Sequence, residues 1–517
     1  NHTEMFGSIF ATGDLGGFAE VSGNTFDLGD KMRVNLGEGG RFLLDPVDVI
    51  IDGDLSESIV EQLNNGTSVT ISTQTGANSS PSDLNVSEQD GSGDITVTSD
   101  IRVPAGSKFA TLSLKADRDI NVQASDSADS IRIQNLQTGS SSGGNVFSFE
   151  AKRNININGI IDNFGGGDGN IFLRSTDGGD ININARIDAN KGGFIIDGTD
   201  VVLKNATTSL LAGGTDVTNN RVQITADNEL KFDGGRLELF GDTDVFINAQ
   251  KFNNLTGSNV FAVNAASADS VQWSVGLPKL YDENNNSIHT FGGLKSNNNA
   301  AYGSAINTNG NGNISIKLHD KNVDITPTNN QYHFANSPSI NITANNDSKI
   351  YGNVADNAFS GISINSDNLI NADDFAGVFT QDTVNSSIDQ SSLELSSTGA
   401  AANQNVGSYN IVPSNLTSPN GYNFNYINGN LTVDRREITL TASDQSKIYG
   451  DELSLGSTAF STTDLDGDSV LPNGELVKTV NLVSENGVDA STDSDVGTYA
   501  DNISITPTAT GAATLTG

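Results

Sequence analysis

The sequence contains no cysteine and is short of basic residues. Without cysteine the chain can form no disulfide, no thiolate zinc site, no iron–sulfur cluster and no cysteine nucleophile. Its 517 residues carry 27 Lys and Arg against 63 Asp and Glu, a formal net charge of −36. Charged residues make up only 17% of the chain, so the acidity reflects scarce cations more than abundant carboxylates. Nucleic acids and anionic membranes are bound by clustered cations, and this composition argues against both as partners.

Long apolar runs are also missing. None approaches the ~20 residues that a transmembrane helix needs. The start, Asn1-His2-Thr3-Glu4, has neither the basic residues nor the apolar stretch of a signal peptide. We therefore expect either a mature chain that has lost its targeting segment or an internal fragment of a longer protein.

The first half of the chain repeats one kind of unit. Short runs alternate β-branched and polar residues and are separated by Gly, Asp and Asn. Alternation with a period of two predicts strands with one buried and one solvated face. The sequence here has no sustained apolar stripe with the 3.6-residue period of a helix, so no helix is predicted. The clearest runs are 94–97, 111–114, 119–122, 154–157, 180–183, 201–203, 237–239 and 245–247.

The spacing of these runs distinguishes two all-β architectures. The runs at Ile120, Ile155 and Ile181 lie 35 and 26 residues apart, and runs at Val201 and Leu230 follow at similar intervals. A β-sandwich uses about seven to nine strands over ~100 residues and then stops. Here the pattern continues without a break to about residue 265, which favours a solenoid. We predict a parallel β-helix over residues 1–265, with a ladder of Ile, Val, Leu and Phe inside.

Near residue 270 the composition changes. Residues 266–338 are rich in Asn and weakly apolar, and the only tryptophan, Trp273, lies close to their start. We interpret this stretch either as a connector or as the cap of the solenoid, whose open end exposes unpaired strand edges.

The last part of the chain contains a second, longer repeat. Residues 349–352 (KIYG) recur as 447–450 (KIYG), an offset of 98 residues, and 406–409 (VGSY) recur as 496–499 (VGTY). We predict two β-rich modules, over 339–434 and 435–517. The run 421–433 at the end of the first copy has no counterpart before the second copy stops, so we expect the second module to be truncated.

Several segments resemble the large exoproteins of bacterial two-partner secretion, the filamentous-haemagglutinin and high-molecular-weight adhesin family. Residues 16–23 (GGFAEVSG) and 42–51 (FLLDPVDVII) are similar to stretches that recur in this family. Trp273-Ser274, followed by 291–294 (FGGL) and Tyr302, resembles the block that ends many of its β-helices. The two Lys-Ile-Tyr-Gly modules resemble the MBG/YDG-type β-modules that follow in these proteins.

This resemblance implies an all-β chain, with a right-handed parallel β-helix followed by tandem small β-rich modules. It also implies export through a partner outer-membrane transporter and a location outside, or on the surface of, a Gram-negative cell. The missing cysteines agree with that route, because a disulfide-stapled loop would resist threading through a narrow pore. The family's N-terminal secretion domain is not visible in the sequence, which agrees with a fragment.

Parallel β-helices also carry polysaccharide lyases and hydrolases, so catalytic carboxylates are an alternative. Such enzymes need carboxylates that converge on one face of the solenoid. Two clusters could supply them: Asp177, Asp180 and Asp188, and Asp227, Asp233, Asp242 and Asp244. Because Gly is frequent beside these positions, we favour turns in which each Asp side chain bonds its local backbone. The histidines show no metal-ligand or triad spacing: His2, His289, His319 and His333. We predict no catalytic residue, no cofactor and no enzymatic activity.

Asp464, Asp466 and Asp468 form the best candidate metal site. Hard carboxylate oxygens around the turn at Gly467 suit Ca²⁺. The run lacks the twelve-residue order and closing Glu of an EF-hand, and the alternative is an acidic surface turn. The Lys-Ile-Tyr-Gly motifs could bind a ligand, but we favour a structural role for them. In that role Ile and Tyr enter the module core and Gly takes a turn with positive φ.

The function that we predict is mechanical and adhesive. The chain would be a rigid stalk that carries attachment surface toward host cells, other bacteria or a biofilm matrix, with a glycan or protein receptor. Binding would be spread over loops or many copies and would act through avidity. A self-assembling extracellular filament or matrix subunit is the first alternative, and a polysaccharide-degrading enzyme is the second.

Overall fold

A computed structural model describes most of the chain, and it divides the chain into two compact units. Unit 1 comprises Asn1–Pro338, Ile370–Ser387 and Pro419–Tyr422, and unit 2 comprises Ser339–Leu369, Ile388–Ser418 and Asn423–Gly517. The residues described are 2–13, 16–23, 25–28, 33–73, 93–124, 131–135, 145–163, 169–189, 192–205, 209–214, 221–241, 244–263, 272–284, 286–296, 298–303, 314–318, 321–325, 330–355, 359–485, 491–506 and 513–516.

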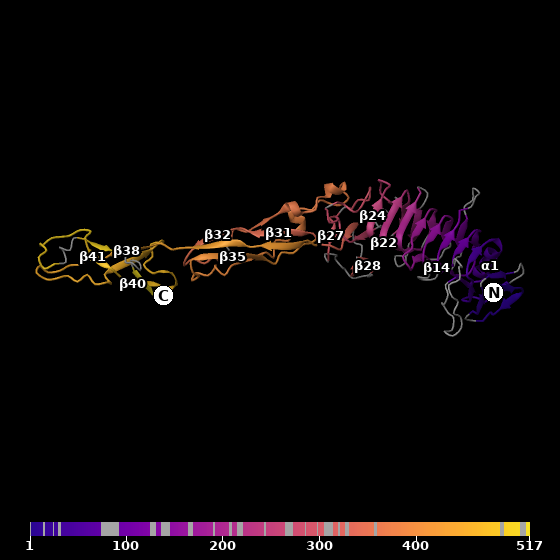
Figure 1. The fold of residues 1–517 in the computed structure, drawn as a ribbon, viewed down its shortest axis with the longest axis horizontal. Helices are drawn as coiled ribbons and strands as arrows, with labels where there is room; N and C mark the ends of the chain where they lie inside the picture. The colour runs from indigo at the N-terminus through magenta and orange to yellow at the C-terminus, as the bar shows by residue number, and fades with distance from the viewer. Residues whose placement is uncertain are drawn as a thin grey trace. The chain divides into compact units, whose positions relative to one another are not determined.

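Unit 1 is a parallel β-helix whose coils stack strand on strand in three columns (Figure 1). The first column contains β3 (Phe18–Ser22), β6 (Arg41–Asp45), β8 (Ser68–Ser72), β11 (Leu112–Ala116), β14 (Asn145–Ala151), β17 (Asn170–Ser175), β20 (Phe194–Lys204), β22 (Arg221–Asp233), β24 (Asp244–Asn254), β26 (Gln272–Leu277) and β30 (Gln331–Phe334), with β27 (Ala301–Tyr302) beside β30. The second contains β7 (Val49–Ile51), β9 (Ile95–Val97), β12 (Ile120–Val122), β15 (Ile155–Ile157) and β18 (Ile181–Ile183), and it continues in the long strands β20, β22 and β24.

The third column and the short pairs complete unit 1. The third column contains β10 (Ile101–Val103), β13 (Arg132–Asn135), β16 (Ile160–Asn163), β19 (Ile187–Asp188), β21 (Ser209–Gly214), β23 (Arg236–Gly241) and β25 (Phe261–Val263). The short pairs are β1 (His2–Met5) with β4 (Thr25–Leu28), β2 (Ser8–Phe10) with β5 (Arg33–Asn35), and the antiparallel hairpin of β28 (Ile314–Leu318) with β29 (Lys321–Ile325).

The core of the solenoid is the apolar ladder that the spacing predicts. Ile95, Ile120, Ile155, Ile181 and Val201 are register partners in successive coils, and each is 0% exposed. The ladder continues through Leu230 and Phe252. Burying each such side chain contributes roughly 1.5–3 kcal/mol. The predicted parallel β-helix is therefore confirmed.

One helix interrupts the strand pattern, and the prediction of no helix in this region was wrong. Helix α1 (Gly53–Asn64) packs against β5 and β10, where a third-column strand would lie. Asp52 caps it by accepting the Leu55 N–H at 3.2 Å. Leu55, Ile59 and Leu63 lie four residues apart and bury one face. In the part of the chain described here, no helix is long and apolar enough to span a membrane.

The parallel ladder extends beyond residue 265, where we expected the solenoid to end. β26 pairs with β24 and with β30, so these two strands of the Asn-rich stretch belong to the coil stack. An aromatic cluster closes this end, in which Trp273, Phe291 and Tyr332 are buried. The cluster is covered by Ile370–Ser387, here called the capping strap, which contains η2 (Ala372–Phe375) and α2 (Val384–Ser387). Phe375 and Phe379 of the strap contact Phe291 at ring-centroid distances of 6.0 and 6.5 Å.

Unit 2 contains two β-modules, called module 1 (339–434, without the parts assigned to unit 1) and module 2 (435–517). Module 1 has a three-stranded sheet of β33 (Ile362–Ile364), β31 (Ser339–Ala344) and β36 (Asn423–Ile427), and a four-stranded sheet of β32 (Asp347–Ile350), β37 (Gly429–Asp434), β35 (Gly407–Ser414) and β34 (Glu394–Ser396), with η1 (Ser366–Asn368). Module 2 has three antiparallel pairs, β38 (Ile438–Ala442) with β39 (Phe460–Asp464), β40 (Leu476–Val480) with β43 (Ala513–Thr516), and β41 (Leu482–Ser484) with β42 (Ile503–Ile505), and η3 (Pro472–Gly474).

The first strand pair has the same register in both modules. Ala344 pairs with Ile362 in module 1, and Ala442 pairs with Phe460 in module 2, at the same offset of 98 residues. The long repeat in the sequence therefore corresponds to a repeat in structure.

Candidate functional site

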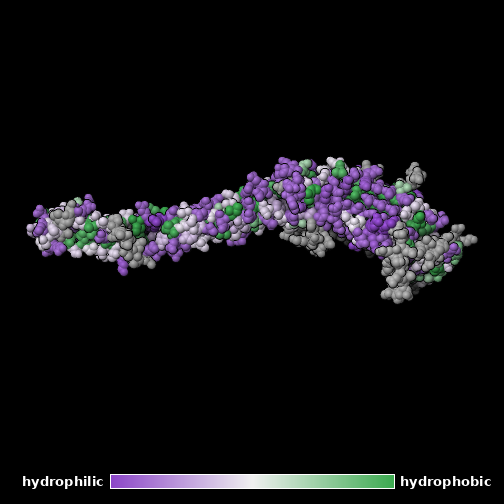
Figure 2. Space-filling model, viewed as in Figure 1, coloured by the Kyte–Doolittle hydropathy of each residue, from purple (hydrophilic) through white to green (hydrophobic). Residues whose placement is uncertain are grey.

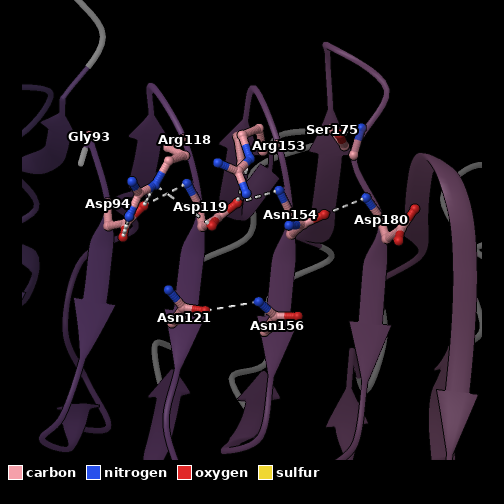
Figure 3. Close-up of polar contacts among 12 residues, drawn as sticks. Gly93, Asp94, Arg118, Asp119, Asn121, Arg153, Asn154, Asn156, Ser175 and Asp180 are labelled. Atoms are coloured by element: carbon pink, nitrogen blue, oxygen red, sulfur yellow. Dashed lines mark hydrogen bonds and ion pairs between the residues drawn. The ribbon is translucent and has the colours of Figure 1, made fainter. Parts of the chain in front are cut away.

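A line of Asp and Asn side chains connects successive coils of the solenoid (Figure 3). Asp94, Asp119, Asn154 and Asp180 each precede the first buried residue of a second-column strand. The Oδ1 atom of each of the first three accepts the N–H of the next, at 3.1, 2.8 and 2.9 Å, and Asp180 accepts the Asp200 N–H at 3.2 Å. We call this line the Asx ladder. It holds each coil in register with the next.

Two arginines neutralise the carboxylates of the Asx ladder. Arg118 binds Asp94 with two hydrogen bonds, of 2.8 Å from Nε and 2.6 Å from Nη2. Arg153 Nε lies 3.7 Å from Asp119 Oδ1. A bidentate arginine–carboxylate pair such as Arg118 with Asp94 is geometrically specific. Both carboxylates therefore have a structural role.

A parallel line of amides runs two residues further along the same strands. Asn156 Nδ2 donates to Asn121 Oδ1 at 2.9 Å, and Asn182 Nδ2 donates to Asn156 Oδ1 at 3.0 Å. The first of these bonds is drawn in Figure 3. Each such bond contributes about 1 kcal/mol net, so the polar face of the coil stack is ordered as well as its core.

The carboxylates considered as catalytic candidates take separate structural positions. Asp180 belongs to the Asx ladder, whereas Asp188 lies on the third-column strand β19, 4.0 Å from Arg186. Asp180 accepts from the next coil, so the expectation that it bonds only its local backbone was wrong. Asp233 lies 3.5 Å from Lys231. Of the remaining candidates, Asp177 and Asp227 are exposed, Asp244 is half-buried, and Asp242 lies outside the described residues.

The capping strap carries a buried carboxylate that the sequence did not single out. Asp382 is 2% exposed, and its oxygens accept from Tyr422 Oη at 2.6 Å, Asn299 Nδ2 at 2.6 Å, Asn420 Nδ2 at 3.0 Å and Tyr302 Oη at 3.0 Å. Burial raises the pKa of Asp382, and the hydrogen bonds from Tyr422 and Asn299 partly offset this. This cage fastens the strap and the segment Pro419–Tyr422 to β27.

Two histidines are buried under the same cap. His289 Nδ1 accepts the Phe252 N–H at 3.2 Å, and its Nε2 lies 2.7 Å from the Lys279 carbonyl oxygen and donates to it. His333 is 4% exposed on β30. Burial lowers the pKa of each to about 4, so both are neutral at pH 7. Of the other two, the His2 side chain and all of His319 lie outside what the structure describes.

In the candidate calcium turn, the cation that contacts the carboxylates is an arginine. Asp464 Oδ1 accepts the N–H groups of Asp466 and Asp468 at 2.9 and 3.0 Å, which closes the turn. Asp464 Oδ2 accepts from Arg436 Nη2 at 2.7 Å, and Arg436 also contacts Asp466. Arg436 holds the pKa of Asp464 below its usual value. Within the described ranges, these and other His, Asp and Glu side chains form no group of three that could hold a metal ion.

The Lys-Ile-Tyr-Gly motifs act through their lysines. Lys349 is 8% exposed, and its Nζ donates to the carbonyls of Asn353 at 2.9 Å, Ala400 at 3.1 Å and Ala401. Burial lowers the pKa of Lys349. Lys447 makes the equivalent contacts in module 2, to the carbonyls of Asp451 and Ser491. We call this arrangement the lysine clamp, and it joins the motif to a distant turn of the same module.

The expectation that Ile and Tyr of this motif enter the module core was wrong. Ile350 and Tyr351 are only half-buried in module 1, and Ile448 and Tyr449 are exposed in module 2. The glycine part of the expectation is confirmed, because Gly352 and Gly450 have φ of +92° and +90°. The signal that could have identified the clamp is the lysine itself, the one cation present in both copies of the motif.

Comparison with known proteins identifies one domain. Residues 340–432 match the family model of the MBG domain (YGX type), a range that covers module 1 together with the capping strap. Domains of this kind are found in surface adhesin-like proteins. No curated protein and no solved structure matches the chain. The family match therefore identifies this domain within an otherwise unmatched β-helical chain.

Proposed function

We propose that this chain is an adhesive protein displayed on a bacterial surface, in which the solenoid is a rigid stalk and the modules extend its attachment surface. The observation that carries the proposal is the MBG domain at residues 340–432, because such domains occur in surface adhesin-like proteins. The resemblance of residues 16–23 and 42–51 to two-partner secretion exoproteins supports export through an outer-membrane transporter of a Gram-negative cell.

The surface of the solenoid agrees with display rather than with a deep binding pocket. Its visible face is mostly hydrophilic, with small separate apolar patches (Figure 2). Several of its carboxylates are engaged by arginines and by backbone N–H groups, as in the pair of Arg118 with Asp94. We therefore propose a binding role without catalysis, with contacts distributed along the surface and strengthened by avidity.

The test is attachment of beads coated with the full chain. The beads are presented to cultured host cells, to bacterial cells and to immobilised matrix glycans and proteins, and control beads carry an inert protein of similar net charge. We expect attachment above the control on at least one of these surfaces. Attachment equal to the control on all of them would overturn the proposal. Release of reducing or unsaturated ends from acidic glycans would instead indicate an enzyme.

A self-assembling filament subunit is the second candidate, and the first coil provides the observation in its favour. Phe6, Phe10 and Phe18 are 71%, 68% and 55% exposed there. Exposed large apolar side chains can mark association sites. Sedimentation velocity over a range of concentrations separates the two candidates, because a filament subunit forms larger species as concentration rises. Replacing Phe6 and Phe10 with Ser would abolish that association.

A further inference from the structure

The joint between module 1 and module 2 is built on the Lys-Ile-Tyr-Gly turn of module 1. Tyr351 Oη donates to Glu475 Oε1 at 2.7 Å, and Arg436 Nη1 donates to Asn353 Oδ1 at 3.1 Å. At Gly352 a Cβ atom would lie 2.5 Å from the Pro472 ring, so module 2 approaches the turn too closely for any other residue. We call Ile350–Gly352 the acceptor turn of module 1.

Module 2 contributes a compact set of residues to this joint, here called its donor face. Arg436 begins the module, and η3 supplies Pro472 and Asn473, with Glu475 directly after it. Asn473 Nδ2 donates to the Ala402 carbonyl at 3.3 Å, beside the residues that hold the lysine clamp. The donor face therefore recognises a turn whose shape the clamp has already fixed.

The turn of residues 448–450 in module 2 is constructed in the same way. Lys447 makes the clamp contacts at equivalent positions, and Gly450 has φ of +90° where Gly352 has +92°. Tyr499 Oη donates to the Asp495 carbonyl at 2.8 Å, as Tyr409 Oη donates to that of Asn405 at 2.8 Å. The strand preceding the turn keeps its register in both modules.

The two turns differ in what covers them. Ile350 and Tyr351 are half-buried, whereas Ile448 is 75% and Tyr449 is 65% exposed. Two adjacent large side chains held outward on a clamped turn have no role in the core of module 2. Exposed apolar groups in a fixed geometry are typical of protein contact sites.

We propose that Ile448, Tyr449 and Gly450 form a docking surface for a further module of this repeat, when one is joined directly after module 2. The occupant is fixed by continuity with the observed joint. It presents an Arg just before its first strand, a Pro–Asn turn against Gly450 and a Glu that accepts from the Tyr449 hydroxyl. The inference rests on the internal repeat and is independent of the adhesive function.

Because the chain has no cysteine, an engineered thiol can report on this surface alone. Two chains are compared, each carrying Ile448→Cys: the 517-residue chain, and the same chain extended by a second copy of residues 422–517, which supplies the strands that end module 1 and then another module 2. Maleimide labelling of the thiol is followed over time. We expect labelling to be about tenfold slower in the extended chain, because docking restricts access to the sulfur.

Three controls make every outcome decisive. Val470→Cys, at a position that is 73% exposed and 20 residues after Gly450, should label equally fast in both chains. Charge reversal of the residues equivalent to Arg436 and Glu475 in the added copy should restore fast labelling at position 448. Equal labelling of that position in both chains, or rapid proteolysis of the added copy, would overturn the proposal. Protection that rises with concentration in the 517-residue chain would overturn it too, since it would indicate contact between separate chains.

Discussion

In the solenoid, Ile120, Ile155 and Ile181 are each completely buried and stack coil on coil, whereas the apolar cluster of module 2 remains partly accessible to solvent. Module 1 has a cluster of Ala344, Ile411 and Leu431, with partly buried neighbours around it. The cluster of module 2 is Leu471, Val477, Val480 and Leu482, each 5–8% exposed. Both regions are β-sheet structures with alternating sequences, yet their cores differ in depth.

The difference shows how each region specifies its structure. In the solenoid, each coil buries its apolar face against the next, so the neighbouring coils supply the stability. In the modules, polar contacts between distant turns add to the apolar burial. The lysine clamp and the pair of Arg436 with Asp464 provide these contacts. Substitutions that remove apolar burial should therefore destabilise the solenoid most. Substitutions that remove a charged contact should destabilise the modules most.

Acid should weaken unit 1 first. His289 and His333 have pKa values of about 4, below the 6.5 of an unfolded histidine, so the unfolded state binds more protons between these values. Their contribution is complete above pH 6.5 and is lost as pH falls, by about 4 kcal/mol for the pair at pH 5. All four histidines lie in unit 1. Urea unfolding followed by fluorescence of the buried Trp273 reports on that unit.

Asp382 opposes this acid effect. Its pKa is raised, so the folded state gains stability from this group as pH falls through that raised value. Asp382→Asn should therefore lose more stability than the unmodified chain as pH falls through that raised pKa. A Trp273 unfolding transition of the Asp382→Asn variant that is the same at pH 7 and pH 5 would contradict the assignment of the two histidines.

Ile155→Ala should destabilise the solenoid by about 2–5 kcal/mol, because it leaves a cavity in the middle of the apolar ladder. Ile448→Ala is the matched control, since this residue is 75% exposed and its removal should change stability by less than about 0.5 kcal/mol. Both are measured as the shift in free energy of unfolding in urea. Similar small effects would show that the coil stack is not the stable region.

Lys349→Met should destabilise module 1 by about 1–3 kcal/mol, because it leaves the carbonyls of Asn353, Ala400 and Ala401 without their donor. Lys447→Met should have a smaller effect, since this lysine is only half-buried. Far-ultraviolet circular dichroism follows the modules, and the Trp273 transition should not move. A shift of the Trp273 transition instead would refute the confinement of the clamp to unit 2.

Asp119→Ala should destabilise the solenoid by only about 1 kcal/mol, because it removes one acceptor of the Asx ladder and the contact with Arg153. Asp119→Asn keeps an acceptor for the Asn154 N–H and should retain most of the stability. The Trp273 unfolding transition is the measurement. An equal loss in both variants would attribute the effect to charge and not to the ladder.

The coil architecture could be predicted because aliphatic residues of the same kind recur once in each coil. Ile120, Ile155 and Ile181 recur with Asp or Asn directly before them, and the structure places all three in register. Helix α1 was missed although Asp52 and the Leu55, Ile59 and Leu63 spacing carried a helix signal. The helix has only 12 residues, and the strand patterns on both sides of it outweighed its signal.

The cap and the clamp could not be predicted, because both depend on partners distant in sequence. Asp382 lies 80 residues from Tyr302 and 40 from Tyr422. The donors to its carboxylate are neutral, so no charge pattern marks the site. Lysines are usually exposed, so nothing in the sequence indicated that Lys349 is buried, and only the fold brings it to Ala400 and Ala401.

Hydrogen exchange along the whole chain tests most directly whether the solenoid is the rigid stalk and the modules are its less stable extensions. The amides of Ile120 and Ile155 donate to the next coil at 2.9 Å in the buried ladder. We predict that they exchange slowest and at similar rates, and that amides of β35 and β38 exchange at least about tenfold faster. Module amides that exchange as slowly as those of Ile120 and Ile155 would contradict this account.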